Sequence, residues 1–170
     1  KQHELHSGKK LQYFDPSTNE SYVPFVIETS VGLDRMFLSV LSASYTEEKL
    51  EDGSERTVLK IPAALAPYKI AILPLIKKDG LPEKAQEIMR MLQLDYTIQY
   101  DEKDSIGKRY RRQDAIGTPF AITVDHETLE SNTVTIRNRD TMTQERIAIE
   151  SLPAFLNTHC SWSSLLDALA

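Results

Sequence analysis

The chain has 170 residues, with 20 Lys and Arg against 25 Asp and Glu, a formal net charge of −5 and 41% hydrophobic residues. This length and composition are typical of one folded domain plus part of a second, and they exclude a disordered or fibrous protein. The acidic balance argues against binding nucleic acid by bulk charge, although not against a local basic surface.

Targeting signals are missing from the sequence. No apolar run approaches the roughly 20 residues of a membrane span, and the polar start lacks the apolar core of a secretory signal. The single cysteine, Cys160, excludes an internal disulfide and a zinc site built from thiolates. We therefore expect a cytoplasmic protein with no membrane partner. Because the sequence does not begin with Met, we also expect it to be a fragment.

The first part of the chain predicts a hairpin, a strand and a helix. Turn-forming residues at 15–19 predict a hairpin or a loop between two strands, and the β-branched and aromatic residues of 22–30 predict the strand. After Gly32, apolar residues recur at helical spacing. Residues 46–57 are nearly all charged or polar, so we expect an exposed connection there and a domain boundary within 46–66.

The remainder alternates between strand and helix patterns. We expect strands at 68–76, 96–100, 120–124, 133–137 and 146–149, helices at 82–94 and 104–116, a turn near 130–132, and short helices capped by Ser151 and Ser161. Strands separated by helices imply an α/β fold, with a mixed β-sheet flanked by helices.

Polar side chains suited to small-molecule binding gather around Gly32. On a strand, Glu28 and Ser30 project from the same face, and Gly32 lets the backbone approach a ligand closely. Arg35 falls in the first turn of the next helix, where the macrodipole favours anions, so a cation there indicates a shared anion such as a phosphate. On spacing alone, the plainer alternative of a solvated Glu, a capping Ser and a surface Arg is the better supported.

A second group of residues is basic. Five cations and one acid, Asp104, lie between Lys103 and Arg112 together with Tyr110, as on a surface that follows RNA phosphates and stacks on a base. The alternative is a solvated helix face. Residues 137–141 end a predicted strand and offer donors and acceptors for base edges, although Arg139 and Asp140 are as well suited to pairing with one another.

Three long segments carry a family resemblance. YVPFVIETSVGLDRMFLSVL resembles the third signature motif of class II aminoacyl-tRNA synthetases, and its VIETS-G-DR pattern is similar to the homodimeric glycyl-tRNA synthetases. LKIPAALAPYKIAILPLIKKDGLPEKA, DSIGKRYRRQDAIGTPFAITVD and NTVTIRNRDTMTQERI resemble the C-terminal anticodon-binding domain of that family. The resemblance runs from about Tyr13 to the end of the chain.

The resemblance implies a remnant of an antiparallel α+β catalytic domain and linker in residues 1–60, and an anticodon-binding domain in residues 61–170. It implies that glycine binds at Glu28, Thr29, Ser30, Val31 and Gly32, and ATP at Gly32, Leu33, Asp34 and Arg35. The tRNA-binding candidates are Lys108, Arg109, Tyr110, Arg112, Arg137, Arg139, Asp140 and Thr141. The implied parent is a homodimeric glycine–tRNA ligase whose partners are tRNA(Gly), glycine and ATP with Mg²⁺, with no intrinsic cofactor.

The chain departs from that family in one respect. The first, dimer-forming motif and the second motif, which grips ATP and the acceptor end of tRNA, have no counterpart here, so the resemblance implies a chain that is inactive alone. The alternative function is a non-catalytic RNA- or protein-binding accessory module with the same fold. We expect no metal site, with His3 and His6 exposed to solvent, His126 in a turn, and Cys160 an unreactive thiol in a terminal loop.

Overall fold

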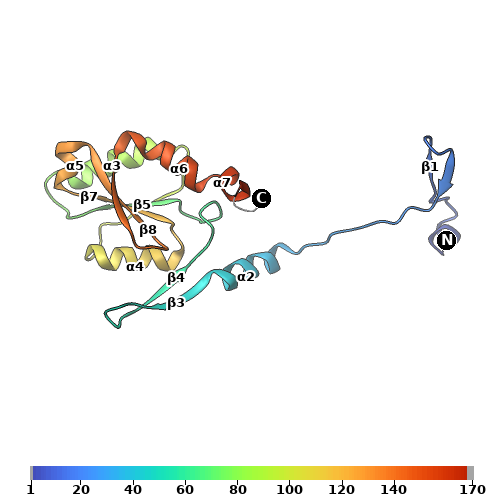
Figure 1. The fold of residues 1–170 in the computed structure, drawn as a ribbon, viewed down its shortest axis with the longest axis horizontal. Helices are drawn as coiled ribbons and strands as arrows, with labels where there is room; N and C mark the ends of the chain where they lie inside the picture. The colour runs from blue at the N-terminus through green and yellow to red at the C-terminus, as the bar shows by residue number, and fades with distance from the viewer. Residues whose placement is uncertain (1, 168–170) are drawn as a thin grey trace. The chain divides into compact units, whose positions relative to one another are not determined.

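The computed structural model describes residues 2–167. The chain forms two compact units, and the boundary between them lies between Met36 and Phe37. In the first unit, α1 (Gln2–Ser7) precedes the antiparallel hairpin of β1 (Tyr13–Asp15) and β2 (Glu20–Tyr22) (Figure 1). The Asp15 carboxylate accepts hydrogen bonds from the amide and hydroxyl of Ser17, which closes the turn. The predicted hairpin is therefore confirmed.

The predicted strand over 22–30 is wrong beyond Tyr22. Residues 23–32 are extended but pair with no strand in the part of the chain that the structure describes. Phe25, Val26 and Ile27 are 101%, 83% and 95% exposed. A β-branched and aromatic run is stable as a strand only where neighbouring strands pair with it and cover its apolar side chains, and residues 2–167 supply no such neighbour. The helix predicted after Gly32 does form, as α2 (Leu33–Ser44).

The second unit contains a hairpin that the sequence did not predict. Immediately after α2, β3 (Tyr45–Lys49) pairs antiparallel with β4 (Glu55–Leu59), where we expected an exposed connection. The polar side chains obscured an alternation in β4, where Arg56 and Val58 are both buried. This hairpin is a separate two-stranded sheet.

A five-stranded mixed sheet forms the centre of the second unit. Its strands are β5 (Ile70–Pro74), β6 (Ile98–Tyr100), β7 (Phe120–Val124), β8 (Thr133–Asn138) and β9 (Gln144–Ala148). Their order is β6-β5-β7-β8-β9, with β6, β5 and β7 parallel and β8 and β9 antiparallel to their neighbours. The α/β expectation, with a mixed sheet flanked by helices, is confirmed.

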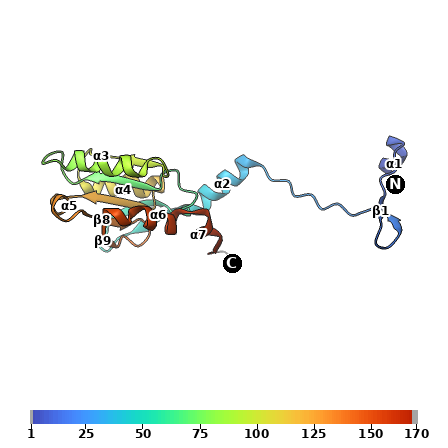
Figure 2. The same ribbon diagram turned by 90° about the horizontal axis from the view of Figure 1, so that it is seen from above.

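Helices cover both faces of this sheet (Figures 1 and 2). Alternation along β5 sends Ile70 and Ile72 to the face under α3 (Leu81–Leu92) and α6 (Leu152–Cys160). Ala71 and Leu73 point the other way, toward α4 (Ile106–Ile116). The main core therefore lies between the sheet and α3 and α6, and α4 packs on a thinner layer of small side chains.

Several local expectations change at the C-terminal end. Asp125 caps α5 (His126–Ser131) in a capping box with Thr128, so His126 begins a helix where we predicted a turn. A short 3₁₀ helix, Ile149–Ser151, precedes α6, and the Ser151 side chain forms no cap. The Ser161 hydroxyl does cap α7 (Trp162–Asp167), accepting a hydrogen bond from the Ser164 amide.

Candidate nucleic-acid interface

Helix α4 carries most of the basic residues identified in the sequence. Two of its arginines differ in burial, because Arg109 lies in the core and Arg112 lies at the surface. Arg109 is 3% exposed, and its guanidinium donates to the carbonyl oxygens of Pro74, Leu75 and Asp104. These bonds tie the start of α4 to the end of β5. The buried guanidinium thus has a structural role, which the sequence pattern did not distinguish from a phosphate contact.

Arg112 lies at the surface and is held by two carboxylates. Its guanidinium donates to Asp101 Oδ2 at 2.7 and 3.0 Å and to Asp104 Oδ2 at 2.9 Å, and its side chain is 41% exposed. Burial alone would raise the pKa of Asp101, but hydrogen bonds from the Lys103 amide and from Arg112 outweigh it and lower the pKa. The Arg112 side chain is therefore fixed in place with one edge open to solvent.

Lys103 and Lys108 are the exposed cations of the basic segment. Neither ammonium group forms a hydrogen bond or ion pair with another residue among 2–167. Arg111 reaches the hairpin instead, donating to the carbonyl of Glu55 at 3.0 Å and the hydroxyl of Ser54 at 3.3 Å. An open groove of about 310 Å³ runs between β4 and α4 beside Arg111.

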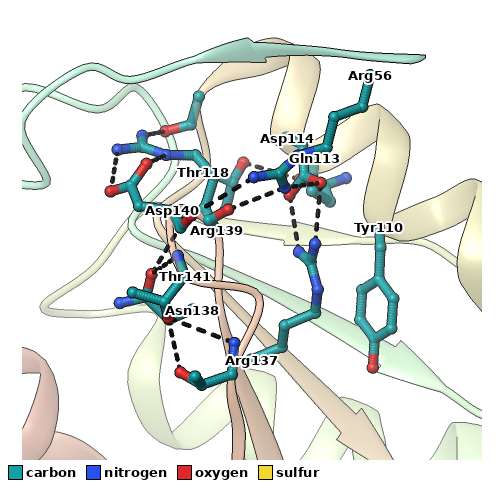
Figure 3. Close-up of polar contacts among 12 residues, drawn as sticks. Arg56, Tyr110, Gln113, Asp114, Thr118, Arg137, Asn138, Arg139, Asp140 and Thr141 are labelled. Carbon is teal, nitrogen blue, oxygen red and sulfur yellow. Dashed lines mark hydrogen bonds and ion pairs between the residues drawn. The ribbon is translucent and has the colours of Figure 1, made fainter. Parts of the chain in front are cut away.

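Tyr110 faces the sheet rather than open solvent. Its hydroxyl shares a hydrogen bond with the hydroxyl of Thr123, and the Arg137 guanidinium carbon lies 4.8 Å from the ring centroid. At that distance the cation is attracted to the face of the ring. The predicted stacking surface for a base is therefore occupied on one side by Arg137, as Figure 3 shows.

The turn between β8 and β9 is organised by its own side chains (Figure 3). Arg139 donates to both carboxylate oxygens of Asp140, at 2.8 and 2.9 Å, and to the carbonyl of Gly117. The pairing of Arg139 with Asp140, one of the two alternatives that the sequence left open, is confirmed. The side-chain oxygen of Asn138 accepts the amides of Asp140 and Thr141. Asp140 and Thr141 remain exposed at the tip.

Beneath this turn lies a buried network of charges. The Asp114 carboxylate in α4 accepts hydrogen bonds from Arg137 at 2.7 and 3.0 Å and from Arg56 of the hairpin at 3.0 Å. All three side chains are at least nine-tenths buried. The sequence pattern did not single out Arg56 or Asp114 as functional residues. The spacing of two between Arg56 and Val58, which is typical of a strand with one buried face, was the one sign of their burial.

The segment around Gly32 is exposed throughout. Glu28, Thr29, Ser30 and Val31 lie on the unpaired extended stretch, and Leu33, Asp34 and Arg35 form the first turn of α2. The structure therefore brings the ATP candidates together on one helical turn. Their roles in binding glycine and ATP stay predictions.

Other chemistry-bearing residues have ordinary environments. Within residues 2–167, no group of three His, Cys, Asp or Glu side chains is placed to hold a metal ion. His3 and His6 are exposed on α1. Cys160 lies in α6 rather than in a loop, and burial raises the pKa of its thiol to about 11, which keeps it protonated at neutral pH. The same part of the chain holds no helix long and apolar enough to span a bilayer.

The parallel β6-β5-β7 core, its antiparallel extension and the helices on both faces define the class, a mixed α/β domain. The family model described as "Anticodon binding domain" matches residues 69–159, more than half of the chain. The chain belongs to this family. The anticodon-binding domain expected from the sequence is thereby confirmed.

Curated relatives extend the likeness beyond this domain. Over 157 residues the chain is 54% identical to a glycine–tRNA ligase of Clostridium tetani, covering 92% of this chain and 34% of that protein. It is 52% identical over 157 residues to one of Chlorobaculum tepidum (92% and 33%) and 56% identical over 155 residues to one of Ruminiclostridium cellulolyticum (91% and 33%). The chain thus spans about a third of the length of the curated relatives it matches.

Two solved structures share this fold. The RNA-binding domain of a threonyl-tRNA synthetase from Cryptosporidium parvum has a TM-score of 0.54 at 21% identity, covering 59% of this chain and 26% of that chain. A prolyl-tRNA synthetase from the same organism has a TM-score of 0.55 at 18% identity, covering 66% and 30%. At these identities the likeness establishes the fold alone.

Proposed function

We propose that the chain is the C-terminal part of a glycine–tRNA ligase, which activates glycine with ATP and transfers it to tRNA(Gly). The observation that carries this proposal is an identity of 52–56% to three named glycine–tRNA ligases over more than nine-tenths of the chain. The likeness extends well beyond residues 69–159, the span of the anticodon-binding match. A non-catalytic accessory module has no need for the segment from Glu28 to Arg35.

In this proposal the anticodon region of tRNA(Gly) binds along α4, from its lysine-bearing start to the β8–β9 turn beside its end. Lys103 and Lys108 supply mobile ammonium groups for phosphates, and Arg112 presents a guanidinium that Asp101 and Asp104 hold in place. Asp140 and Thr141 offer a carboxylate and a hydroxyl at the tip of the turn, where unstacked bases expose their edges.

The buried arginines hold the proposed RNA-binding surface of α4 and the β8–β9 turn in place. Arg109 holds α4 on β5, Arg137 holds Tyr110 and Asp114, and Arg139 fixes Asp140. Their guanidinium groups are already engaged within the protein. We therefore assign the direct RNA contacts to the exposed neighbours.

The segment from Glu28 to Arg35 supplies part of the glycine and ATP site. Glu28 is suited to pairing with the ammonium group of glycine, while Thr29, Ser30 and Val31 narrow the pocket against larger amino acids. Arg35, together with Gly32, Leu33 and Asp34, contacts ATP and stabilises charge as the adenylate forms. In this proposal ATP binds together with Mg²⁺ as a co-substrate of the complete enzyme.

The domain boundaries, assembly and location belong to the same proposal. We assign residues 1–60 to the catalytic domain and linker, and residues 61–170 to the anticodon-binding domain. The β3–β4 hairpin packs with the second compact unit, which begins at Phe37. The complete enzyme is proposed to act as a homodimer in the cytoplasm.

Binding of a tRNA(Gly) transcript to this chain, followed by fluorescence anisotropy, tests the RNA interface. We expect weak binding that falls steeply with salt and is weakened by the double substitution Lys103→Gln and Lys108→Gln. Arg90→Gln is the matched control, because Arg90 is exposed on α3, on the opposite face of the sheet. Equal loss in both variants, or no binding by the unsubstituted chain, would contradict the interface.

Glycine-dependent exchange of pyrophosphate into ATP tests the enzyme assignment. The complete parent protein is expected to catalyse this exchange, and the 170-residue chain alone is expected not to. Lack of exchange by the parent would favour the accessory module. Exchange by the chain alone would contradict the partial nature of its glycine and ATP site.

A further inference from the structure

The β3–β4 hairpin lies outside the five-stranded sheet, so no backbone ladder fixes its position on that sheet. Its packing on the second unit depends on side chains of β4 and on a close approach to Gly117, where the carbonyl of Leu59 comes near the end of α4. On β4 the buried side chains are those of Arg56 and Val58. The apolar side chain of Val58 by itself would let the hairpin slide over the surface beneath it. The hydrogen-bonded guanidinium of Arg56 holds the hairpin in one orientation.

Arg56 makes the polar contacts that fix the hairpin. Its side chain is 1% exposed, and all three of its guanidinium nitrogens are engaged. Nε donates to Glu48, its cross-strand partner in β3, at 2.7 Å. Nη1 donates to Asp114 of α4 and to the carbonyl of Arg139, both at 3.0 Å. One side chain thus joins both strands of the hairpin to α4 and to the β8–β9 turn (Figure 3).

The charges around Arg56 alternate in sign. Lys60 pairs with Glu48 at 2.7 Å, Glu48 with Arg56, Arg56 with Asp114, and Asp114 with Arg137. Hydrogen bonding from Lys60, and then from Arg56, lowers the pKa of Glu48, so this carboxylate is ionised at neutral pH. Displacing the hairpin would separate Arg56 from Asp114 and leave part of the buried Asp114 carboxylate without a partner, which disfavours displacement.

We infer that Arg56 is a positioning residue that fixes the β3–β4 hairpin, and with it the end of α2, on the surface formed by α4 and the β8–β9 turn. Helix α2 ends at Ser44 and β3 begins at Tyr45, with no residue between them. Ser44 is buried, and its carbonyl accepts the amide of Lys60. The functional meaning rests on the proposed function, in which α4 and the turn bind tRNA.

Hydrogen–deuterium exchange of the whole chain tests this inference. A two-stranded hairpin is only marginally stable by itself, so its amides exchange faster once it detaches. In Arg56→Met we expect amides of 45–59 to exchange about tenfold faster or more, while those of β5 and β7 change by less than about twofold. Arg111→Met, which removes a more exposed link to the hairpin, is the matched control and should change hairpin exchange by less than about twofold.

Uniform acceleration throughout the second unit, or unchanged exchange in the hairpin, would overturn the positioning role. If Arg56→Met does not fold, Glu48→Gln decides the question, because it weakens the hairpin end of the network and leaves Asp114 paired. Faster exchange confined to the hairpin is expected for that variant. Arg56→Lys keeps the charge without the planar fork and should restore only part of the protection.

The affinity for a tRNA(Gly) transcript shows whether Arg56 positions the hairpin or contacts the RNA directly. Because the Arg56 guanidinium is buried, Arg56→Met should bind the transcript within about twofold of the unsubstituted chain. A tenfold loss of affinity with unchanged hairpin exchange would place Arg56 at the RNA surface and overturn the inference. If the unsubstituted chain binds no tRNA, the proposed function fails, while the exchange experiment still tests the positioning role.

Discussion

Asp114 of α4 and Arg137 of β8 form a bidentate ion pair, with Oδ1 to Nη1 at 2.7 Å and Oδ2 to Nη2 at 3.0 Å. Their side chains are 1% and 7% exposed, so the pair is shielded from solvent. Arg56 donates to the same carboxylate from the opposite side. One carboxylate therefore pairs with two buried guanidinium groups from separate elements. Its loss leaves Arg137 without its carboxylate partner and Arg56 with Glu48 alone.

We predict that Asp114→Ala lowers the free energy of unfolding by about 3–5 kcal/mol, because it leaves buried charges unpaired. Urea denaturation followed by circular dichroism measures this change. Glu55→Ala is the control, since Glu55 also pairs with a cation, Lys49, but the two side chains are 70% and 84% exposed. That variant should lose about 1 kcal/mol or less. Equal losses would mean that the buried network does not stabilise the fold.

The sequence predicted the elements whose signal is local. The apolar run that became β5 and the helical stripe of α3 form close to where periodicity placed them. The strand over 22–30 failed, because a strand also needs neighbours, and residues 2–167 provide none. Helix α5 was missed because its six residues are too few to establish a helical period.

The interface was only partly predictable for a related reason. A run of cations indicates positive charge, but burial decides whether each cation contacts solvent. Arg137 lies 23 residues from Asp114, and Arg56 lies 58 residues from it. Only the assembled sheet brings these side chains together. Three predicted RNA-contact arginines, Arg109, Arg137 and Arg139, are turned toward partners within the protein.

The pair of Asp125 and Arg146 makes stability depend on pH. Hydrogen bonds from Arg146, and then from Thr128, outweigh burial and hold the pKa of Asp125 at about 2, below the ordinary 3.8. Because folding lowers this pKa, the stabilisation is complete above about pH 4 and is lost as the pH falls toward 2. Arg146→Met should therefore cost about 2 kcal/mol at pH 7 and about half of that at pH 3.

Urea denaturation of the Arg146→Met variant between pH 7 and pH 3 measures this dependence. Lys84→Met serves as the control, because the Lys84–Glu87 pair lies on the surface of α3 and contributes little at any pH. A difference between Arg146→Met and the unsubstituted chain that stays constant over this range would contradict the pKa shift as its source.

Substitutions of two adjacent cations on α4, Lys108 and Arg109, are predicted to change different properties, tRNA binding in one case and stability in the other. Lys108→Gln should leave stability within about 0.5 kcal/mol, because the side chain is exposed, and should weaken tRNA binding with a salt slope smaller by about 1. Arg109→Met should instead destabilise the fold by about 3 kcal/mol, because buried carbonyls at the end of β5 lose their donor. Thermal unfolding and anisotropy titrations measure the two effects, and an identical profile for both variants would contradict this division of roles.

Gly117 ends α4 with φ +83°, a left-handed conformation, at the point where the hairpin comes closest. A Cβ added there would lie 3.0 Å from the carbonyl oxygen of Leu59, a backbone atom that cannot rotate away. Gly117→Ala should therefore combine backbone strain with a clash and cost about 2–3 kcal/mol. Gly80, with φ +79° and open space around it, is the matched position, and Gly80→Ala should cost about 1 kcal/mol from backbone strain alone. Urea denaturation compares the two, and equal costs would mean that the hairpin yields at Gly117 without loss of stability.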